Sequence, residues 1–264
     1  MRACCCVGGS ESFAMIDSDP LETTCDSFLG GALQVLQPSA GYRAGMDAVL
    51  LGASIPAQAG QHVLDVGCGV GTAGLCLASR VPGVQVTGIE LQPDLHRLAM
   101  QNAANNGLDD RVGFVCGDVQ KKGRLVPARS FDHVISNPPY IAETSGRRSG
   151  TQHADLSKRE LEITLADWVE AMLYWVKERG NITIIHRADR LHEIIDLLVP
   201  RVGDIHVCPV WPKQGRNANR VLVQGRREAR AGLTLAPGIA VRDDHDEVTA
   251  EMEALQRYGR GLVF

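Results

Sequence analysis

Two patterns of hydrophobic and polar residues alternate along the chain. Short apolar runs end in glycine or polar residues and predict buried strands, whereas longer segments repeat apolar residues every three or four positions and predict helices. The expected strands lie at 61–67, 84–90, 111–118, 131–137, 181–187, 204–212 and 219–227, with a strand-like stretch at 233–241. The expected helices lie at 46–54, 72–81, 92–107, 156–180 (as one helix or two), 188–200 and 247–259.

This alternation of strands and helices is typical of an α/β protein with a mostly parallel sheet. The last two predicted strands are expected to close the sheet as a pair. Residues 24–39 have the pattern of a short hairpin, and residues 1–20 are small and polar, which predicts a disordered tail. The 264 residues are therefore interpreted as a single domain over 21–264, with a catalytic core at about 60–230.

Polar residues follow four successive predicted strands. Asp65, Glu90, Asp118 and Asn137 lie at or directly after the ends of these strands. In a right-handed parallel sheet the carboxyl ends meet at one edge, which is where such sheets bind ligands. The combination of four is more specific than any one of them, because a single strand-end aspartate is commonly a helix cap.

The segment "DVGCGVGTAG" places glycines immediately after the first of these strands. Gly69, Gly71 and Gly74 match the spacing of a dinucleotide-binding fingerprint, which alone is a weak signal. Asp65, however, puts a carboxylate just before the glycines, where a cation is favoured over a pyrophosphate. Three strand-end carboxylates suit a cationic cofactor that carries an amino acid and an adenosine. A nucleotide-binding Rossmann module, such as a nicotinamide enzyme, remains the alternative.

The segment "SNPPYIAE" places a stiff elbow after the fourth strand. Pro138 and Pro139 lack backbone N–H groups and have fixed φ angles, and Pro138 favours an extended conformation for Asn137. The elbow offers the Asn137 side-chain carbonyl, the free Pro138 backbone carbonyl and the Tyr140 ring. Two acceptors and a stacking surface suit a planar amine or amide held by its NH₂ group. A simple turn is the structural alternative, because Asn-Pro is common in turns.

Four segments resemble, in order, the motifs of class I S-adenosylmethionine-dependent methyltransferases across about 60–140. These segments are "VLDVGCGVGTAGLCLA", "VTGIEL", "FVCGD" and "VISNPPY". The resemblance implies a Rossmann-like α/β fold with a mostly parallel seven-stranded sheet, helices on both faces and an antiparallel closing strand. It also implies S-adenosyl-L-methionine as the cofactor.

The same resemblance implies a role for individual residues. It places Asp65 near the methionine ammonium, Glu90 on both ribose hydroxyls and Asp118 on the adenine amino group, and the glycines let the backbone approach the cofactor. The implied cofactor-binding residues are Asp65, Gly67, Gly69, Gly71, Glu90, Leu91, Asp118 and Asn137. The implied catalytic residues are Asn137, Pro138, Pro139 and Tyr140, and no metal is expected.

The segments that flank these motifs reduce the number of possible methyl acceptors. In the enzymes that the chain resembles, an elbow of this kind serves adenine N6, guanine N2 or a glutamine amide. "GYRAGMDAVLLGAS", "GRNANRVLVQGRR" and the C-terminal segment resemble the bacterial adenine-N6 methyltransferases that modify valine tRNA. The chain departs from that pattern before Asp47, where Thr is missing, and at Ser54, where an aromatic residue is common. Asp47 is either a site residue or a helix cap.

We therefore expect methyl transfer to adenine N6 in tRNA, with an unpaired anticodon-loop base as the target. Protein glutamine N5-methylation of release factors is the main alternative, although those enzymes usually carry a sizeable helical domain before the glycines. A DNA methyltransferase typically needs a target-recognition domain, for which no stretch of this chain is long enough.

Charge gives a second, weaker indication of an RNA partner. The net charge of −4 argues against a nucleic-acid coat over the whole surface, but not against a local basic rim. Solvated arginines without an RNA role are the alternative. The basic residues in question are Arg147, Arg148, Lys158 and Arg159 after the elbow, and Lys213, Arg216, Arg220, Arg226, Arg227 and Arg230 farther on.

The remaining features indicate a cytoplasmic protein without a membrane partner. No apolar run approaches the roughly 18 residues of a membrane helix, and the N-terminal segment lacks the apolar stretch of a secretory signal. The eight cysteines form no C-x-x-C pair and are interpreted as reduced thiols, with the role of Cys4–Cys6 and the oligomeric state left open. Structural roles are expected for His186, Trp168, Tyr174 and Trp175.

Overall fold

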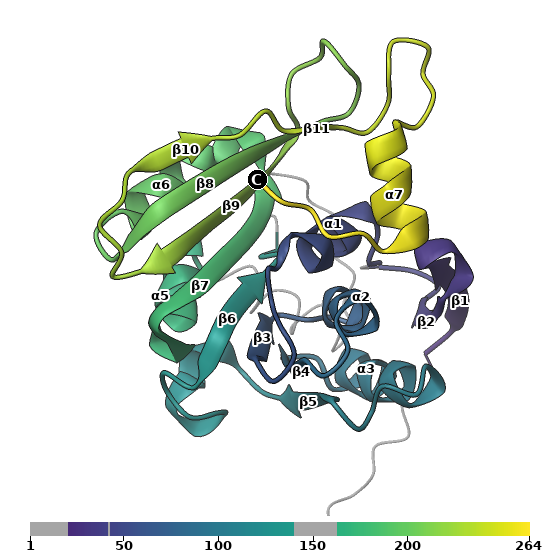
Figure 1. Ribbon diagram of the computed structural model, residues 1–264. Coiled ribbons are helices and arrows are strands. Elements are labelled where there is room, and N and C mark those ends of the chain that lie inside the picture. The colour runs from purple at the N-terminus through teal and green to yellow at the C-terminus, as the bar shows by residue number, and fades with distance from the viewer. Residues whose placement is uncertain (1–20, 42, 140–162) are drawn as a thin grey trace, which may run out of the picture.

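The structure is a computed structural model that describes residues 21–41, 43–139 and 163–264. Figure 1 shows a twisted sheet flanked by helices, with a small hairpin at one side. The predicted tail 1–20, the Cys4–Cys6 triplet, Tyr140 and the basic residues expected at 147–159 lie outside the described residues.

Nine strands of the described part of the chain form the central sheet, in the order β10-β8-β9-β7-β6-β3-β4-β5 with β11 beside β8. Their bounds are β3 (His62–Val66), β4 (Gln85–Glu90), β5 (Val112–Cys116), β6 (Phe131–Ser136), β7 (Val176–Arg187), β8 (Val202–Trp211), β9 (Arg220–Arg227), β10 (Leu233–Leu235) and β11 (Ile239–Ala240). The seven predicted strands are all present, and β10 and β11 add two short strands beside β8.

The strand directions confirm a mostly parallel sheet with an antiparallel closing strand. β3 runs parallel to β4 and β6, and the parallel pairing continues to β5 and β7. β9 runs antiparallel to both of its neighbours, β7 and β8. The carboxyl ends of β3, β4, β5, β6, β7 and β8 therefore share one edge, whereas β9 begins at that edge and ends at the opposite one.

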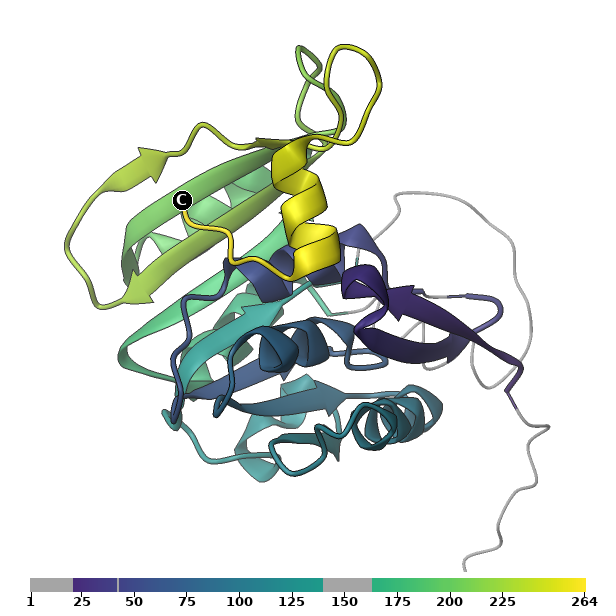
Figure 2. The same ribbon diagram turned by 45° about the vertical axis from the view of Figure 1, so that its right-hand side comes forward.

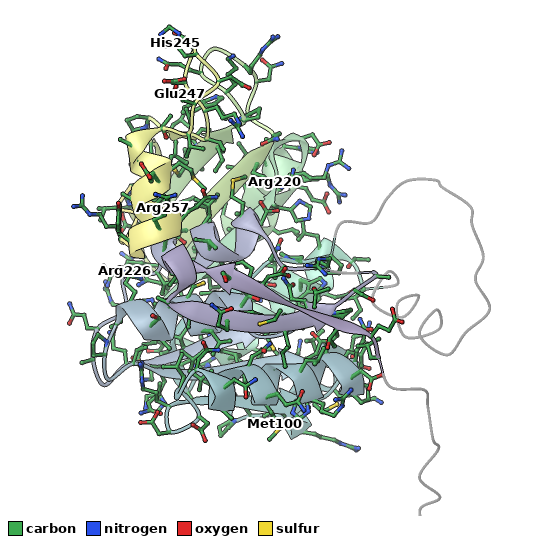
Figure 3. All side chains as sticks on the ribbon, turned by 90° about the vertical axis from the view of Figure 1, so that its right-hand side faces the viewer. Met100, Arg220, Arg226, His245, Glu247 and Arg257 are labelled. Atoms are coloured by element: carbon green, nitrogen blue, oxygen red, sulfur yellow. The ribbon has the colours of Figure 1, made fainter. Side chains whose placement is uncertain are left out.

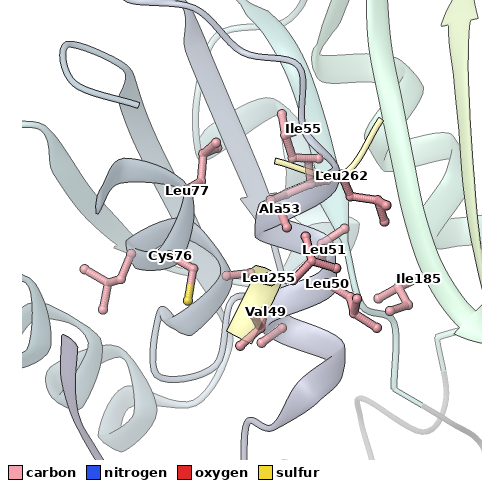
Figure 4. Close-up of a cluster of buried hydrophobic side chains, with 14 of the residues drawn as sticks. Val49, Leu50, Leu51, Ala53, Ile55, Cys76, Leu77, Ile185, Leu255 and Leu262 are labelled. Atoms are coloured by element: carbon pink, nitrogen blue, oxygen red, sulfur yellow. The ribbon is translucent and has the colours of Figure 1, made fainter. Parts of the chain in front are cut away.

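The helices cover both faces of the sheet over two large hydrophobic cores, and a smaller cluster joins α3 to the hairpin. Successive side chains of a strand point to opposite faces, so Val63 packs in the first core and Leu64 and Val66 in the second. The close-up in Figure 4 shows the first core around α1. The helices are α1 (Met46–Ser54), α2 (Thr72–Arg80) and α7 (Ala250–Tyr258) at the first core, α5 (Leu165–Trp175) and α6 (Leu191–Leu198) at the second, and α3 (Pro93–Asn105) beside β5.

The predicted helix over 156–180 is wrong at its C-terminal end. α5 ends at Trp175, and β7 begins at the next residue, Val176. The polar segment "VKERG" has good helix formers, but Val176 instead pairs with Phe131 of β6 and is buried. Tertiary pairing therefore overrides the local helix preference at this junction.

The predicted hairpin is confirmed as β1 (Thr23–Phe28) and β2 (Leu33–Pro38), an antiparallel pair outside the main sheet. Figure 2 shows it on the side of the molecule away from β8 and β10. Asn102 of α3, whose side chain is fully buried, attaches it: Oδ1 accepts from the Leu36 N–H at 2.7 Å, and Nδ2 donates to the Leu36 carbonyl at 3.0 Å. The same Nδ2 donates to the Val70 carbonyl at 3.0 Å. One amide side chain thus joins the hairpin to the glycine segment.

We expect Asn102→Ala to lower the free energy of unfolding by about 2–4 kcal/mol, because it leaves buried backbone groups of Leu36 and Val70 without their partner. Urea unfolding would measure the change. Asn105→Ala, at an exposed position of the same helix, is the matched control and should change stability by less than about 0.5 kcal/mol. Equal unfolding midpoints for the two variants would contradict the proposed attachment.

Candidate functional site

The strand ends that carry the predicted site residues lie side by side at the carboxyl edge of the sheet. Val66 of β3 pairs with Ile89 of β4 on one side and with Ser136 of β6 on the other. Glu90 pairs with Cys116 at the end of β5. The residues that follow these positions therefore leave the sheet together, and the segments around Asp65, Glu90 and Asn137 meet at one edge.

The glycine segment after β3 is a loop built on left-handed backbone. The φ angles are 70° at Gly67, 57° at Gly69 and 85° at Gly71. Side chains on two of these residues would also collide, since a Cβ on Gly67 would lie 2.6 Å from the Trp168 ring and one on Gly71 would lie 2.7 Å from Phe114. Gly67 and Gly71 are required both by their φ angles and by close packing, and Gly69 by its φ angle, and together they leave a loop of bare backbone at the edge.

Glu90 is the polar residue that connects this loop to β4. Its side chain is buried, with Oε2 accepting from the Gly69 N–H at 2.8 Å and Oε1 accepting from the Gln92 N–H at 2.9 Å. Each carboxylate oxygen thus accepts from one backbone N–H, which fixes the orientation of the side chain. Glu90 is therefore held in place before any ligand arrives.

Asp65 is nearly inaccessible, with 3% of its surface exposed, and it lies beneath the loop. Burial raises the pKa of Asp65 to about 7, and a hydrogen bond from the Gly74 backbone N–H acts in the opposite direction. Burial, reinforced by the negative charges of Asp65 and Glu90, also raises the pKa of Cys68 well above its usual range, so this thiol stays protonated. The acidic region beneath the loop thus favours a cation.

The two other predicted cofactor residues occupy the turns after β4 and β5. Leu91 is half-buried, and its carbonyl lies 3.9 Å from the Cys116 sulfur. Asp118 is half-buried and accepts from the Gln120 N–H at 2.9 Å, which makes it the cap of the short 3-10 helix η2 (Val119–Arg124). The cap uses one of the carboxylate's acceptor positions, and its predicted contact with an adenine remains a prediction.

The elbow leaves β6 next to the glycine loop. Pro138 is buried, whereas Asn137 and Pro139 are half-buried. Immediately before them, the fully buried Ser136 hydroxyl donates to the Val66 carbonyl at 2.8 Å. Ser136, which the sequence did not single out, thus connects the elbow to the strand that leads into the loop.

The aromatic residues of α5 and His186 of β7 are buried or partly buried, as their predicted structural roles require. Trp168 and Trp175 are buried, and Tyr174 packs partly against the same core. In addition, the Trp168 ring packs against Gly67 and so supports the glycine loop. His186 is buried near the end of β7, and burial lowers its pKa to about 4, which leaves the ring neutral at physiological pH.

The expected basic rim over 213–230 does not form one surface. Arg220 begins β9 at the carboxyl edge, whereas Arg226 lies near its other end, roughly 20 Å away along an extended strand. Figure 3 shows these two residues on different sides of the molecule. These arginines are close in the sequence but not in space, because β9 runs from the carboxyl edge of the sheet to the opposite edge.

Arg227 is also excluded from a phosphate-binding rim, because it is buried. Its Nη1 donates to the Leu173 carbonyl at 2.7 Å and to the Val176 carbonyl at 3.0 Å, so it binds carbonyls at the end of α5. Lys213 and Arg216, in the turn between β8 and β9, remain with Arg220 at the carboxyl edge.

Comparison with known proteins identifies the family of the chain. A family model described as "Methyltransferase small domain" matches residues 44–154. The chain is 39% identical over 189 residues to the tRNA1(Val) (adenine(37)-N6)-methyltransferase of Yersinia enterocolitica, covering 71% of this chain and 74% of the relative. It is 30% identical over 181 residues to the enzyme of the same name from Actinobacillus pleuropneumoniae, covering 67% and 73%.

The chain belongs to the same methyltransferase family as these relatives. Solved structures agree on the fold: a predicted O-methyltransferase from Agrobacterium tumefaciens superposes with a TM-score of 0.68 at 23% identity, over 82% of this chain and 98% of that one. Geranyl diphosphate C-methyltransferase from Streptomyces coelicolor, solved with S-adenosyl-L-homocysteine, superposes with a TM-score of 0.50 at 13% identity, over 69% and 74%.

The cofactor of this methyltransferase is S-adenosylmethionine, and the edge has the features needed to hold it. The loop offers bare backbone, Glu90 places an oriented carboxylate beside it, and Asp65 is a buried acid beneath it. Among the residues that the structure describes, no group of histidine, cysteine and acidic side chains has the arrangement of a metal site. Within the same residues, no helix is long and apolar enough to cross a membrane.

The raised pKa of Asp65 predicts a pH-dependent cofactor affinity. Asp65 is half ionised at about pH 7, and only its ionised form would attract the methionine ammonium that the resemblance places beside it. The affinity for S-adenosylhomocysteine should therefore rise roughly threefold to tenfold between pH 6 and pH 8, as measured by calorimetry. Asp65→Asn should bind more weakly at pH 8 and lose this slope. An unchanged slope in that variant would assign the pH dependence to another group.

Proposed function

We propose that this methyltransferase transfers a methyl group to N6 of an adenine in tRNA, in the anticodon loop. The observation that carries the proposal is the common edge of the glycine loop and the elbow, tied by the 2.8 Å bond between Ser136 and Val66. The names of the two relatives above support the tRNA substrate and the adenine N6 position. Such a substrate is consistent with a cytoplasmic enzyme.

The elbow is proposed to orient the acceptor amine. The Asn137 side-chain carbonyl and the Pro138 backbone carbonyl accept its two N–H bonds, which favours a pyramidal nitrogen with its lone pair available. Pro138 and Pro139 fix the backbone that presents these acceptors, and Tyr140 is proposed to stack on the base. When bound, S-adenosylmethionine supplies a methyl group already activated by its sulfonium.

The loop side is proposed to fix the donor relative to this amine. Glu90 accepts from the ribose hydroxyls, Asp118 accepts from the adenine amino group, and Asp65 attracts the methionine ammonium. The protein then mainly has to align the two reacting atoms, since positioning by itself lowers the barrier of a two-substrate reaction. A strong general base is not required, because methyl transfer leaves a positively charged, acidic nitrogen that readily loses its proton to solvent.

The roles of the two sides predict separable defects. Asn137→Ala should lower methyl transfer to total tRNA by at least about 100-fold, measured with radiolabelled cofactor, while the affinity for S-adenosylhomocysteine changes by less than about threefold. Asn105→Ala, an asparagine replaced at an exposed position of α3, serves as the control and should retain activity. Release factor supplied in place of tRNA should accept no label.

Three outcomes would contradict this assignment. Retained transfer by the Asn137 variant would remove the proposed acceptor role. Loss of cofactor binding in that variant would move Asn137 to the donor side. Labelling of the release factor with none of tRNA would replace the nucleic-acid substrate by a glutamine amide.

A further inference from the structure

The carboxyl edge holds an ion pair between residues that are 173 positions apart in the sequence. Arg220 Nε donates to Asp47 Oδ2 at 2.9 Å, and the side chains are 27% and 18% exposed, respectively. Arg220 Nη1 also donates to the Asn219 carbonyl at 3.1 Å. A pair this sheltered from water interacts more strongly than an exposed one and leaves an uncompensated charge when one partner is removed.

The pair lies close to the elbow in the strand order. Arg220 pairs with Arg187, the last residue of β7, and Ser136 pairs with Ile184 three residues earlier on the same strand. The elbow therefore leaves the sheet on one side of the end of β7, and Arg220 lies on the other side. The elbow and Arg220 are thus two strand spacings apart across the sheet, which corresponds to roughly 10 Å.

The two ends of α1 are held by different means. At its C-terminal end, the carbonyls from Gly52 to Ile55 accept hydrogen bonds from Arg80, Leu262 and Gln224. At its N-terminal end the cap residue is Gly45, which has no side chain to bind the first turn. Among the described residues, the Asp47–Arg220 pair is the ion pair that ties this helix to the sheet.

We propose that Asp47 and Arg220 form a positioning pair, which holds the first turn of α1 against β9 and so sets one wall of the acceptor side. The proposal rests on the tRNA methylation proposed above. Asp47 is then a positioning residue, and the guanidinium of Arg220 serves the pair. Because an acid in the first turn also interacts favourably with the helix dipole, Asp47 is placed to fix both the helix and the strand.

The competing interpretation is that Arg220 binds a tRNA phosphate directly. The two roles differ in their dependence on salt. Loss of a phosphate contact raises KM for tRNA and reduces the slope of log KM against log salt by about one unit. Loss of a positioning pair instead lowers kcat, because a small displacement of the acceptor disturbs the alignment of the reacting atoms.

Asp47→Asn, Arg220→Gln and the double variant test the proposal, with total tRNA as substrate and saturating cofactor. We expect each single variant to lower kcat on the order of tenfold and to leave the salt slope unchanged. The kcat of the double variant should be no lower than that of the less active single variant, because the two residues act as one unit. Arg201→Gln is the matched control: it removes an arginine from the ion pair with Glu170 at the opposite edge and should retain kcat.

Hydrogen exchange supplies a readout that does not depend on activity. The amides of Leu50 and Leu51, in α1, should exchange faster in both single variants than in the wild type and in Arg201→Gln. The proposed positioning role would be overturned if amide exchange were unchanged in both single variants, or if the losses of kcat were additive in the double variant. A raised KM with a smaller salt slope in Arg220→Gln alone would assign Arg220 to phosphate binding. A wild type that methylates no tRNA would overturn the proposed function, and the exchange measurement would still decide the pair.

Discussion

The reversal of the chain between β3 and α2 is the constraint on which the site depends. Gly67, Gly69 and Gly71 all adopt positive φ, and the rings of Trp168 and Phe114 fill the space where side chains of Gly67 and Gly71 would begin. Aromatic rings therefore pack against the bare loop and hold its backbone in one conformation, although the glycines have no side chains of their own. Removal of either support would free the loop without touching a ligand-binding residue.

The two buried acidic residues at this edge, Glu90 and Asp65, are stabilised in different ways. Glu90 is buried but satisfied by two backbone N–H groups, so its orientation is fixed by hydrogen bonds. Asp65 is buried and accepts a hydrogen bond from the Gly74 N–H, and burial is the main cause of its raised pKa. A positive charge placed near Asp65 would relieve that cost, which makes a cationic ligand favourable there, whereas a pyrophosphate would add to it.

The sequence predicted the alternating elements and the shared edge because both depend on local pattern and on the handedness of parallel sheets. It could not predict that "VKERG" extends β7, since the pairing of Val176 with Phe131 is a long-range contact. The arginines of 213–230 looked like one cluster, but the direction of β9 separates Arg220 from Arg226. Asn102, Ser136 and the Asp47–Arg220 pair act through contacts across 32 to 173 positions, which no local pattern reports.

The residues before β3 connect the two sides of the site, which we propose hold the methyl donor and the acceptor. The hairpin reaches the glycine loop through Asn102, which bonds to both Leu36 and Val70. α1 continues from the hairpin and reaches β9 through Asp47, on the far side of the elbow. A displacement of this segment would shift the loop and the acceptor wall together, because one continuous stretch of chain contacts both. Under the proposed function, the alignment of the two substrates depends on this segment, although its sequence has neither a strand-end carboxylate nor a glycine loop.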